Sequence, residues 1–218
     1  MENLDQTAEA IRQDFERKNA ARDQAYQSSR DLIRLCARSI RAIHREEWDT
    51  AEALIAEARE ATEKMVDGVR DFPALYFAGY TQDAVKEFVE ANLTYALVRN
   101  RPLPRPEDLE AETNTWLNGL AEAATELRRR ILDIMRHGHS AEAERLLDAM
   151  DQIYSVLVTF DFNDSITGGL RRRTDTVRAV LERTRGDITT SLRQAELEEA
   201  LEALEFRLRN LSPAQLEE

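Results

Sequence analysis

The fold that we expect depends on one stretch of the sequence, Tyr80-Thr-Gln-Asp-Ala-Val-Lys-Glu-Phe-Val-Glu-Ala-Asn-Leu-Thr-Tyr-Ala-Leu-Val98. It contains no Gly or Pro, and Thr81 is a suitable N-cap residue, so we predict a helix from about Thr81 to Asn100. At 3.6 residues per turn, apolar residues gather on one side. The other side carries four polar residues, Asp83, Glu87, Glu90 and Thr94.

Glu87 and Glu90 are one helical turn apart on this side and point the same way. Two such carboxylates can share a hard divalent cation such as magnesium if another helix supplies at least one more carboxylate. The alternative is a solvated acidic helix face, which the spacing alone favours. The stretch by itself therefore leaves both interpretations open.

The composition predicts an all-α fold on both sides of this stretch. Ala, Leu, Glu and Arg dominate the 218 residues, whereas strand formers are scarce and there are only seven Gly and five Pro. No shift in composition marks a second domain, so we expect one domain over residues 1–218, a bundle of about seven helices. The expected helices cover residues 3–45, 49–68, 81–100, 106–134, 141–160, 170–185 and 187–212, with Gly186 breaking the last two apart.

Charge and apolar patterning indicate the environment of the protein. The net charge is −12, and only three of the 30 basic residues are lysines. An acidic, lysine-poor surface suits a high-salt cytoplasm, so we hypothesise a halophilic protein. The N-terminus has no leader pattern and no apolar run reaches the length of a membrane span, so we expect a soluble cytoplasmic protein that does not contact membranes.

A second set of carboxylates lies on the helix expected over residues 106–134. Glu122 and Glu126 share one face of it, and Gly119 leaves room beside them for close approach of a neighbouring helix. Glu122 is therefore a candidate third ligand. Neither acidic pair includes the histidine that di-metal carboxylate bundles usually carry in a Glu-x-x-His motif.

Two arginine clusters, 128–130 and 171–173, accompany the acidic residues. Magnesium with nearby arginines fits phosphodiester chemistry, because the metal activates water while arginines hold the backbone phosphates. The alternative for each cluster is a solvated helix face. The sequence has no Gly-rich phosphate loop, nucleophile elbow or cysteine zinc spacing, so common nucleotide-binding and serine-hydrolase classes lose support.

Three stretches resemble the translin and Trax family, and its archaeal Trax-like branch most. Lys-Glu-Phe-Val-Glu-Ala, residues 86–91, resembles the Gln-Glu-Tyr-Val-Glu-Ala motif of Trax. Residues 115–127, Thr-Trp-Leu-Asn-Gly-Leu-Ala-Glu-Ala-Ala-Thr-Glu-Leu, resemble its Asp-Tyr-Leu-x-Gly-Val-Ala-Asp-Leu-x-Gly-Glu-Leu stretch. Residues 170–178 resemble the basic C-terminal helix region.

The resemblance implies a seven-helix bundle that assembles into hollow homo-hexamers or homo-octamers. It also implies a magnesium- or manganese-dependent endoribonuclease that cleaves single-stranded RNA inside the barrel. Glu87 and Glu90 match two Trax glutamates and Glu122 matches an aspartate, so these three residues are expected to be catalytic and to hold the metal. Glutamate is one methylene longer than aspartate, which is a departure from the family pattern. Glu126 matches a glutamate of both branches, which suggests a structural role.

The arginines expected to contact the nucleic acid are Arg128, Arg129, Arg171, Arg172 and Arg173. The alternative function is that of translin, which binds single-stranded RNA and DNA without cleavage. The two alternatives differ at the acidic residues and agree at the arginines.

Overall fold

The structure is a computed structural model that describes residues 2–138 and 140–209. Within these ranges it consists of helices connected by loops, with no strand, so the predicted all-α class is confirmed. Its elements are α1 (Glu2–His44), α2 (Trp48–Val69), α3 (Pro73–Tyr76), α4 (Gly79–Val98), the 3-10 helix η1 (Glu107–Leu109), α5 (Thr113–Met135), α6 (Ala141–Leu157), α7 (Asp164–Thr167) and α8 (Leu170–Arg209).

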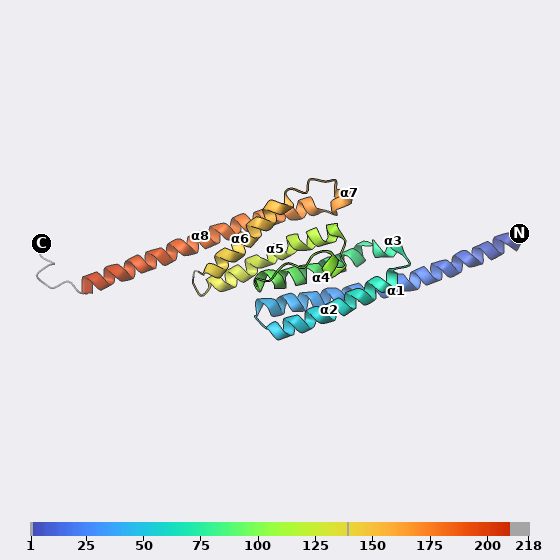
Figure 1. Ribbon diagram of the computed structural model, residues 1–218, viewed down its shortest axis with the longest axis horizontal. Helices are drawn as coiled ribbons and strands as arrows, with labels where there is room; N and C mark the ends of the chain where they lie inside the picture. Colours follow the sequence, from blue (N-terminus) through green and yellow to red (C-terminus); the bar gives the residue numbers. More distant parts are fainter. Residues whose placement is uncertain (1, 139, 210–218) are drawn as a thin grey trace, which may run out of the picture.

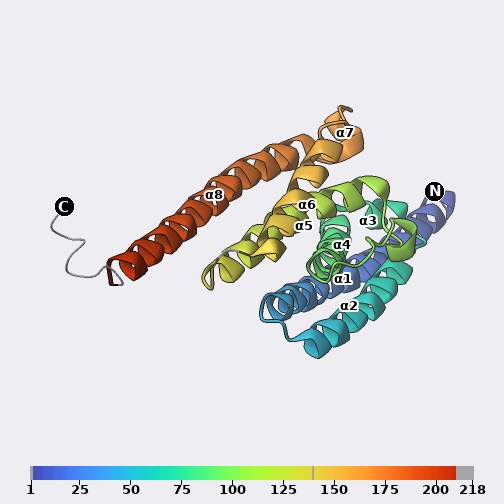
Figure 2. The ribbon, with the colours of Figure 1, turned by 60° about the vertical axis from the view of Figure 1, so that its left-hand side comes forward.

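The helices form a layered bundle with α4 in its middle (Figure 1). On one side α4 packs against α1 and α2, which also pack against each other. On the other side it packs against α5, and α5 in turn contacts α6 and α8 (Figure 2). The first half of α1 and the last half of α8 project beyond the bundle at opposite ends of the molecule (Figure 1).

The burial of α4 follows from this position. Its apolar residues, such as Phe88 and Leu93, are buried, and so is part of its polar side: Thr94 is 0% and Glu90 is 7% exposed, whereas Glu87 is half-buried and Asp83 is exposed. The interpretation of this side as a solvated acidic face is therefore wrong at Glu90 and Thr94. The predicted N-cap is also wrong, because the helix begins at Gly79 and the hydroxyl of Thr81 instead donates to the carbonyl of Leu75 at 2.8 Å.

Close approach of α4 and α5 depends on Gly119. A Cβ built at this glycine would lie 2.6 Å from Cγ1 of Val89 and 3.1 Å from the carbonyl oxygen of Lys86. No side chain larger than hydrogen fits there without movement of one helix. The prediction that Gly119 makes room beside Glu122 is confirmed.

Two predicted helix boundaries differ from the structure. α8 continues through Gly186, so the break expected there is wrong: a single glycine costs a helix only about 1 kcal/mol relative to alanine. The helix expected from Pro106 begins at Thr113, because Pro106 leads into η1 and Glu110 then adopts a left-handed conformation with φ of 49°. The expected end of the last helix at residue 212 lies outside the described residues.

None of the described helices combines the length and the apolar character needed to cross a membrane.

Candidate metal centre and nucleic-acid interface

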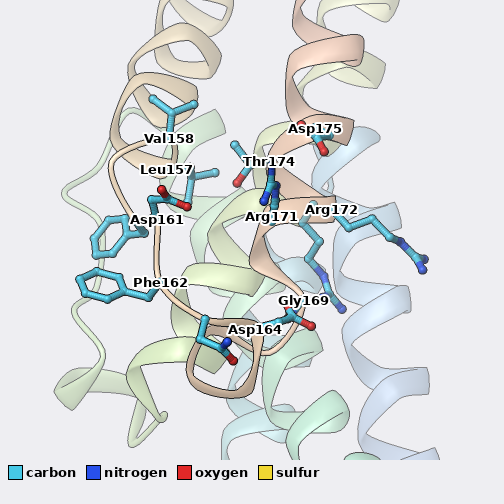
Figure 3. A pocket seen from close by; sticks show the side chains of 13 residues that line it. Leu157, Val158, Asp161, Phe162, Asp164, Gly169, Arg171, Arg172, Thr174 and Asp175 are labelled. Atoms are coloured by element: carbon cyan, nitrogen blue, oxygen red, sulfur yellow. The ribbon is translucent and has the colours of Figure 1, made fainter.

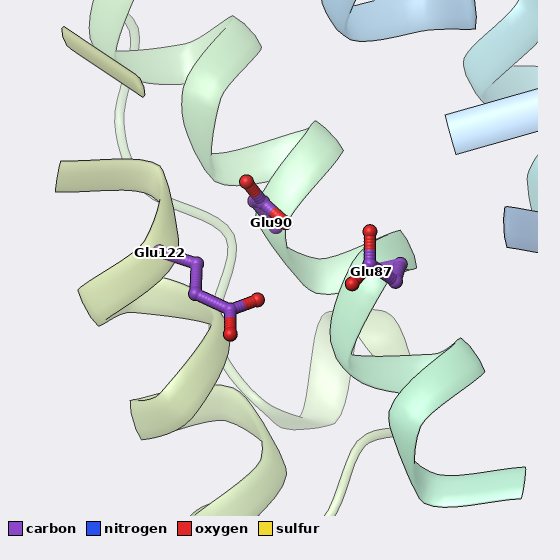
Figure 4. A group of neighbouring side chains, drawn as sticks. All are labelled: Glu87, Glu90 and Glu122. Carbon is purple, nitrogen blue, oxygen red and sulfur yellow. The ribbon is translucent and has the colours of Figure 1, made fainter. Parts of the chain in front are cut away.

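Three carboxylates converge between α4 and α5. Glu87 and Glu90 project from α4, and Glu122 projects from α5 toward them (Figure 4). One oxygen from each lies within 4.8 Å of the others, which is a spacing that a single cation can bridge. The three residues predicted from the sequence as metal ligands thus lie close together. They meet across the contact between α4 and α5 that Gly119 allows.

Two basic side chains contact this cluster. Nζ of Lys86 donates to Oε1 of Glu87 at 2.9 Å and also to Oε2 of Glu122. Nε of Arg173, from α8, donates to Oε1 of Glu122 at 2.8 Å. The side chain of Lys86 is only 10% exposed, whereas those of Glu87 and Glu122 are each 27% exposed, so solvent reaches the carboxylates.

The environment separates the pKa values of two of the carboxyl groups. Burial, together with the negative charges of Glu87, Glu122 and Glu126, raises the pKa of Glu90 to about 9. Burial acts in the same direction on Glu122, but the hydrogen bonds from Arg173 and Lys86 outweigh it and lower the pKa of Glu122. Glu90 is therefore protonated at neutral pH when no cation is present, and Glu122 is ionised.

Glu126 is close to the cluster but has its own partner. Nε2 of His44, whose side chain is 1% exposed, lies 2.7 Å from Oε2 of Glu126 and ties the end of α1 to α5. This contact fits the structural role that the resemblance suggests. The neighbouring Cys36 is fully buried, and burial raises the pKa of its thiol, so it is not a reactive group.

The arginines named from the sequence occupy three different settings. Arg173 is bonded to the carboxylate cluster, while Arg171 and Arg172 are exposed at the start of α8. Arg128 is largely engaged, because its guanidinium contacts Asp187 at 2.8 Å and the hydroxyl of Thr184 at 3.1 Å. Arg129, on the other hand, is exposed.

A hollow of about 1020 Å³ lies beside the first turns of α8. Arg171 and Arg172 line one wall, and the loop after α6, with Asp161 and Phe162, lines the other (Figure 3). Arg173 also lines the hollow. A second hollow of about 190 Å³ is lined by Arg172, Arg173 and Glu122. Because Arg172 and Arg173 line both hollows, the arginine wall extends to the carboxylate cluster.

Lys86 is the residue of this site that the sequence reasoning did not single out. It precedes Glu90 by four residues, which places the two side chains on one helical face. The spacing rule that paired Glu87 with Glu90 would therefore also have found Lys86. The contact of Arg173 with Glu122 had no comparable local signal, because 51 residues separate the two.

Comparisons with known proteins give relatives over most of the chain, although no family model matches. The chain is 32% identical over 193 residues to the uncharacterized protein MJ0175 of Methanocaldococcus jannaschii, which is 88% of this chain and 85% of that protein. The chain also matches the crystal structure of the translin/Trax protein AfC3PO, with 33% sequence identity and a TM-score of 0.81. The match covers 88% of this chain and 99% of that one.

A structure of AfC3PO in complex with duplex RNA matches equally well, with 33% identity and a TM-score of 0.81 over 88% of this chain and 98% of that one. The crystal structure of apo-NeC3PO shares the fold, with a TM-score of 0.77 and 18% identity over 84% of this chain and 96% of that chain.

Proposed function

Because the chain belongs to the translin/Trax family, we propose that it is a metal-dependent endoribonuclease that cleaves single-stranded RNA inside a homo-oligomeric barrel. The observation that carries the proposal is the convergence of Glu87, Glu90 and Glu122 from two helices within 4.8 Å. These three residues are the proposed catalytic and metal-binding residues.

The donor set fits magnesium or manganese. All three groups are carboxylates, which are the hard oxygen ligands these cations prefer, and two of them are open enough to solvent for ligand exchange. Bound there, the metal would supply a Lewis acid beside the phosphodiester and activate water for attack. Glu90 must lose its proton to become a ligand, because burial holds its pKa at about 9.

The arginines of α8 supply the proposed contacts to the nucleic acid. Arg171 and Arg172 are exposed on the wall of the larger hollow, and Arg172 and Arg173 continue that wall to Glu122. A strand whose phosphates follow this wall would reach the carboxylates with its scissile bond. Arg129 is free to join such contacts, whereas Arg128 would first have to leave Asp187.

RNA binding draws support from AfC3PO, which has been solved in complex with duplex RNA. We propose single-stranded RNA as the substrate and single-stranded DNA as a second ligand. Assembly into a homo-hexamer or homo-octamer draws support from the projecting parts of α1 and α8, since their large apolar residues are at least half exposed in one chain. These residues are Leu4, Ile11, Phe15, Leu197, Leu201, Leu204, Phe206 and Leu208.

A translin-like protein that binds single-stranded RNA or DNA without cleavage is the second candidate. One observation favours it: Lys86 and Arg173 already bond two of the three carboxylates, so the cluster is partly neutralised without any metal. The longer Glu122 in place of aspartate adds to this, because magnesium tolerates little deviation from octahedral geometry.

Cleavage of an end-labelled RNA separates the two candidates. Single-stranded and duplex RNA are each incubated with magnesium or manganese, at low and molar salt, and with wild-type protein, Glu90→Gln and Glu182→Gln. Glu182 is an exposed carboxylate of α8 outside the cluster and serves as the control. We expect metal-dependent cleavage of the single strand that Glu90→Gln lowers about 100-fold or more and Glu182→Gln leaves unchanged. Binding without cleavage under all conditions would instead identify a non-catalytic binder.

A further inference from the structure

We infer that Lys86 is a tethered counter-ion that occupies the cation position of the carboxylate cluster and competes with the divalent metal for it. The inference rests on the proposed metal site and concerns how that site is regulated. It assigns to this lysine the role of setting the metal concentration at which the cluster fills.

The contacts of Lys86 carry the inference. Its Nζ atom bonds Glu87 and Glu122, which come from different helices, and these are the partners that the described structure gives it. Both partners are proposed metal ligands. An ammonium group held between two carboxylates occupies the place where a cation bridging them would lie, so both cannot be there together.

Arg173 differs from Lys86 in this respect. It also bonds Glu122, but its guanidinium has further acceptors in the side-chain oxygen of Asn118 at 3.2 Å and the carbonyl of Gly168 at 3.3 Å. Arg173 can therefore keep its hydrogen bonds to Asn118 and Gly168 when Glu122 binds a metal. Lys86 loses both of its carboxylate partners when Glu87 and Glu122 become ligands.

Burial makes this competition strong. The side chain of Lys86 is 10% exposed, and its backbone carbonyl lies beside Gly119, where α4 and α5 approach closely and hold the charged groups together. Charge-assisted hydrogen bonds with little exposure to water are stronger than surface ion pairs. The metal must break two of them, and its apparent affinity falls accordingly.

The sum of the charges at the cluster also favours displacement of Lys86 by the metal. Once ionised, the three proposed ligands carry a charge of −3 and the two basic side chains at the cluster carry +2, so a divalent cation added without displacement would leave these groups with an excess of positive charge. Displacement of Lys86 removes that excess.

Calorimetric titration of the full-length protein with magnesium chloride, and separately with manganese chloride, tests the inference. Wild type is compared with Lys86→Gln and with Lys64→Gln, which removes an exposed lysine of α2. We expect Lys86→Gln to lower the dissociation constant on the order of tenfold and Lys64→Gln to leave it unchanged. We also expect a larger rise of the melting temperature with metal for Lys86→Gln than for wild type.

Each other result overturns the inference. Equal or weaker metal binding by Lys86→Gln, with clear binding by wild type, would show that Lys86 does not compete and would leave the proposed function intact. Absence of metal binding in both proteins would overturn the inference and the proposed nuclease together. These two failures are therefore distinguishable.

A measurement on wild type covers the case in which Lys86→Gln does not fold. The chain has only three lysines, so protein labelled with ¹³C at lysine Cε gives a simple spectrum. Magnesium should shift the Lys86 signal and leave those of Lys18 and Lys64 in place. A Lys86 signal that does not move while metal binds would overturn the inference.

Discussion

The burial of Glu90 determines its protonation state. The residue is 7% exposed and has three other carboxylates nearby, and burial together with their charges raises the pKa of its carboxyl group to about 9. Glu122, a few ångströms away, has a lowered pKa because Arg173 and Lys86 bond it strongly enough to outweigh its burial. Two carboxyl groups of one cluster thus differ in protonation at neutral pH, so binding of the proposed metal would depend on pH.

The raised pKa of Glu90 predicts how stability depends on pH without metal. In the unfolded chain this group loses its proton near its ordinary value of 4.5, whereas in the folded protein it keeps the proton up to about 9. The free energy of unfolding therefore falls as pH rises between these values, by up to about 1.4 kcal/mol per pH unit. Glu90→Gln removes this loss, so its advantage over wild type should grow from pH 5 to pH 8.

Denaturant unfolding at fixed protein concentration in the presence of EDTA measures this advantage. Glu182→Gln, at an exposed position, should instead follow the wild-type curve. Parallel curves for wild type and Glu90→Gln would show that the group is not held protonated.

The contact of α4 with α5 is the element that makes the site. It is close because residue 119 is glycine, and the closeness is what lets Glu122 reach Glu87 and Glu90. Gly186, within α8, has no atom within 4 Å of the Cβ that alanine would add, so it offers a matched substitution without a clash.

Gly119→Ala should push the two helices apart and lower the free energy of unfolding by about 1–3 kcal/mol. It should also weaken metal binding, because the third carboxylate moves away from the first two. Gly186→Ala should raise the free energy of unfolding by about 0.5–1 kcal/mol, since alanine is the better helix former.

Thermal and denaturant unfolding of both variants, with a metal titration, checks these values. A stable Gly119→Ala variant with unchanged metal affinity would contradict the account of the close approach.

The sequence predicted those features of α4 and α5 that depend only on the spacing of residues along one helix. The spacing of Glu87 and Glu90, and the placing of a small residue beside Glu122, follow from helical periodicity, which any single helix displays. The burial of Glu90 and Thr94 on the polar side of α4 was not predictable in this way, because it depends on which helices pack around them. The break expected at Gly186 failed because burial of Leu181 and Ile188 on either side holds α8 together.

At the scale of the whole molecule, the projecting ends of α1 and α8 are unusual for a protein that acts as a single chain. Each carries large apolar residues that are at least half exposed, including Phe15 on α1 and Leu201 on α8. Exposed apolar stripes of this kind are typical of surfaces that contact another molecule. The proposed barrel of several copies would cover them and enclose the arginine wall.

Leu201→Glu should therefore reduce the size of the assembly, as light scattering coupled to size-exclusion chromatography would measure. Ala203→Glu adds the same charge to an exposed position of the same helix and should leave the assembly intact. A wild-type protein that elutes as a monomer would contradict the proposed barrel.

The net charge of −12 predicts a gain in stability with salt. Counterions screen the repulsion among acidic groups, so the melting temperature should rise by roughly 5 °C or more between dilute and molar potassium chloride. Sucrose at matched osmolality controls for general exclusion of solutes from the surface. An unchanged melting temperature would count against a halophilic protein.

The most direct test of the central claim is an anomalous difference map from crystals of the wild-type protein soaked in manganese chloride. We expect one strong peak between α4 and α5, within coordination distance of Glu87, Glu90 and Glu122, with Lys86 displaced from it. A cluster that holds no metal, in crystals of a protein whose RNA cleavage depends on manganese, would contradict the proposed metal centre and place the chemistry elsewhere.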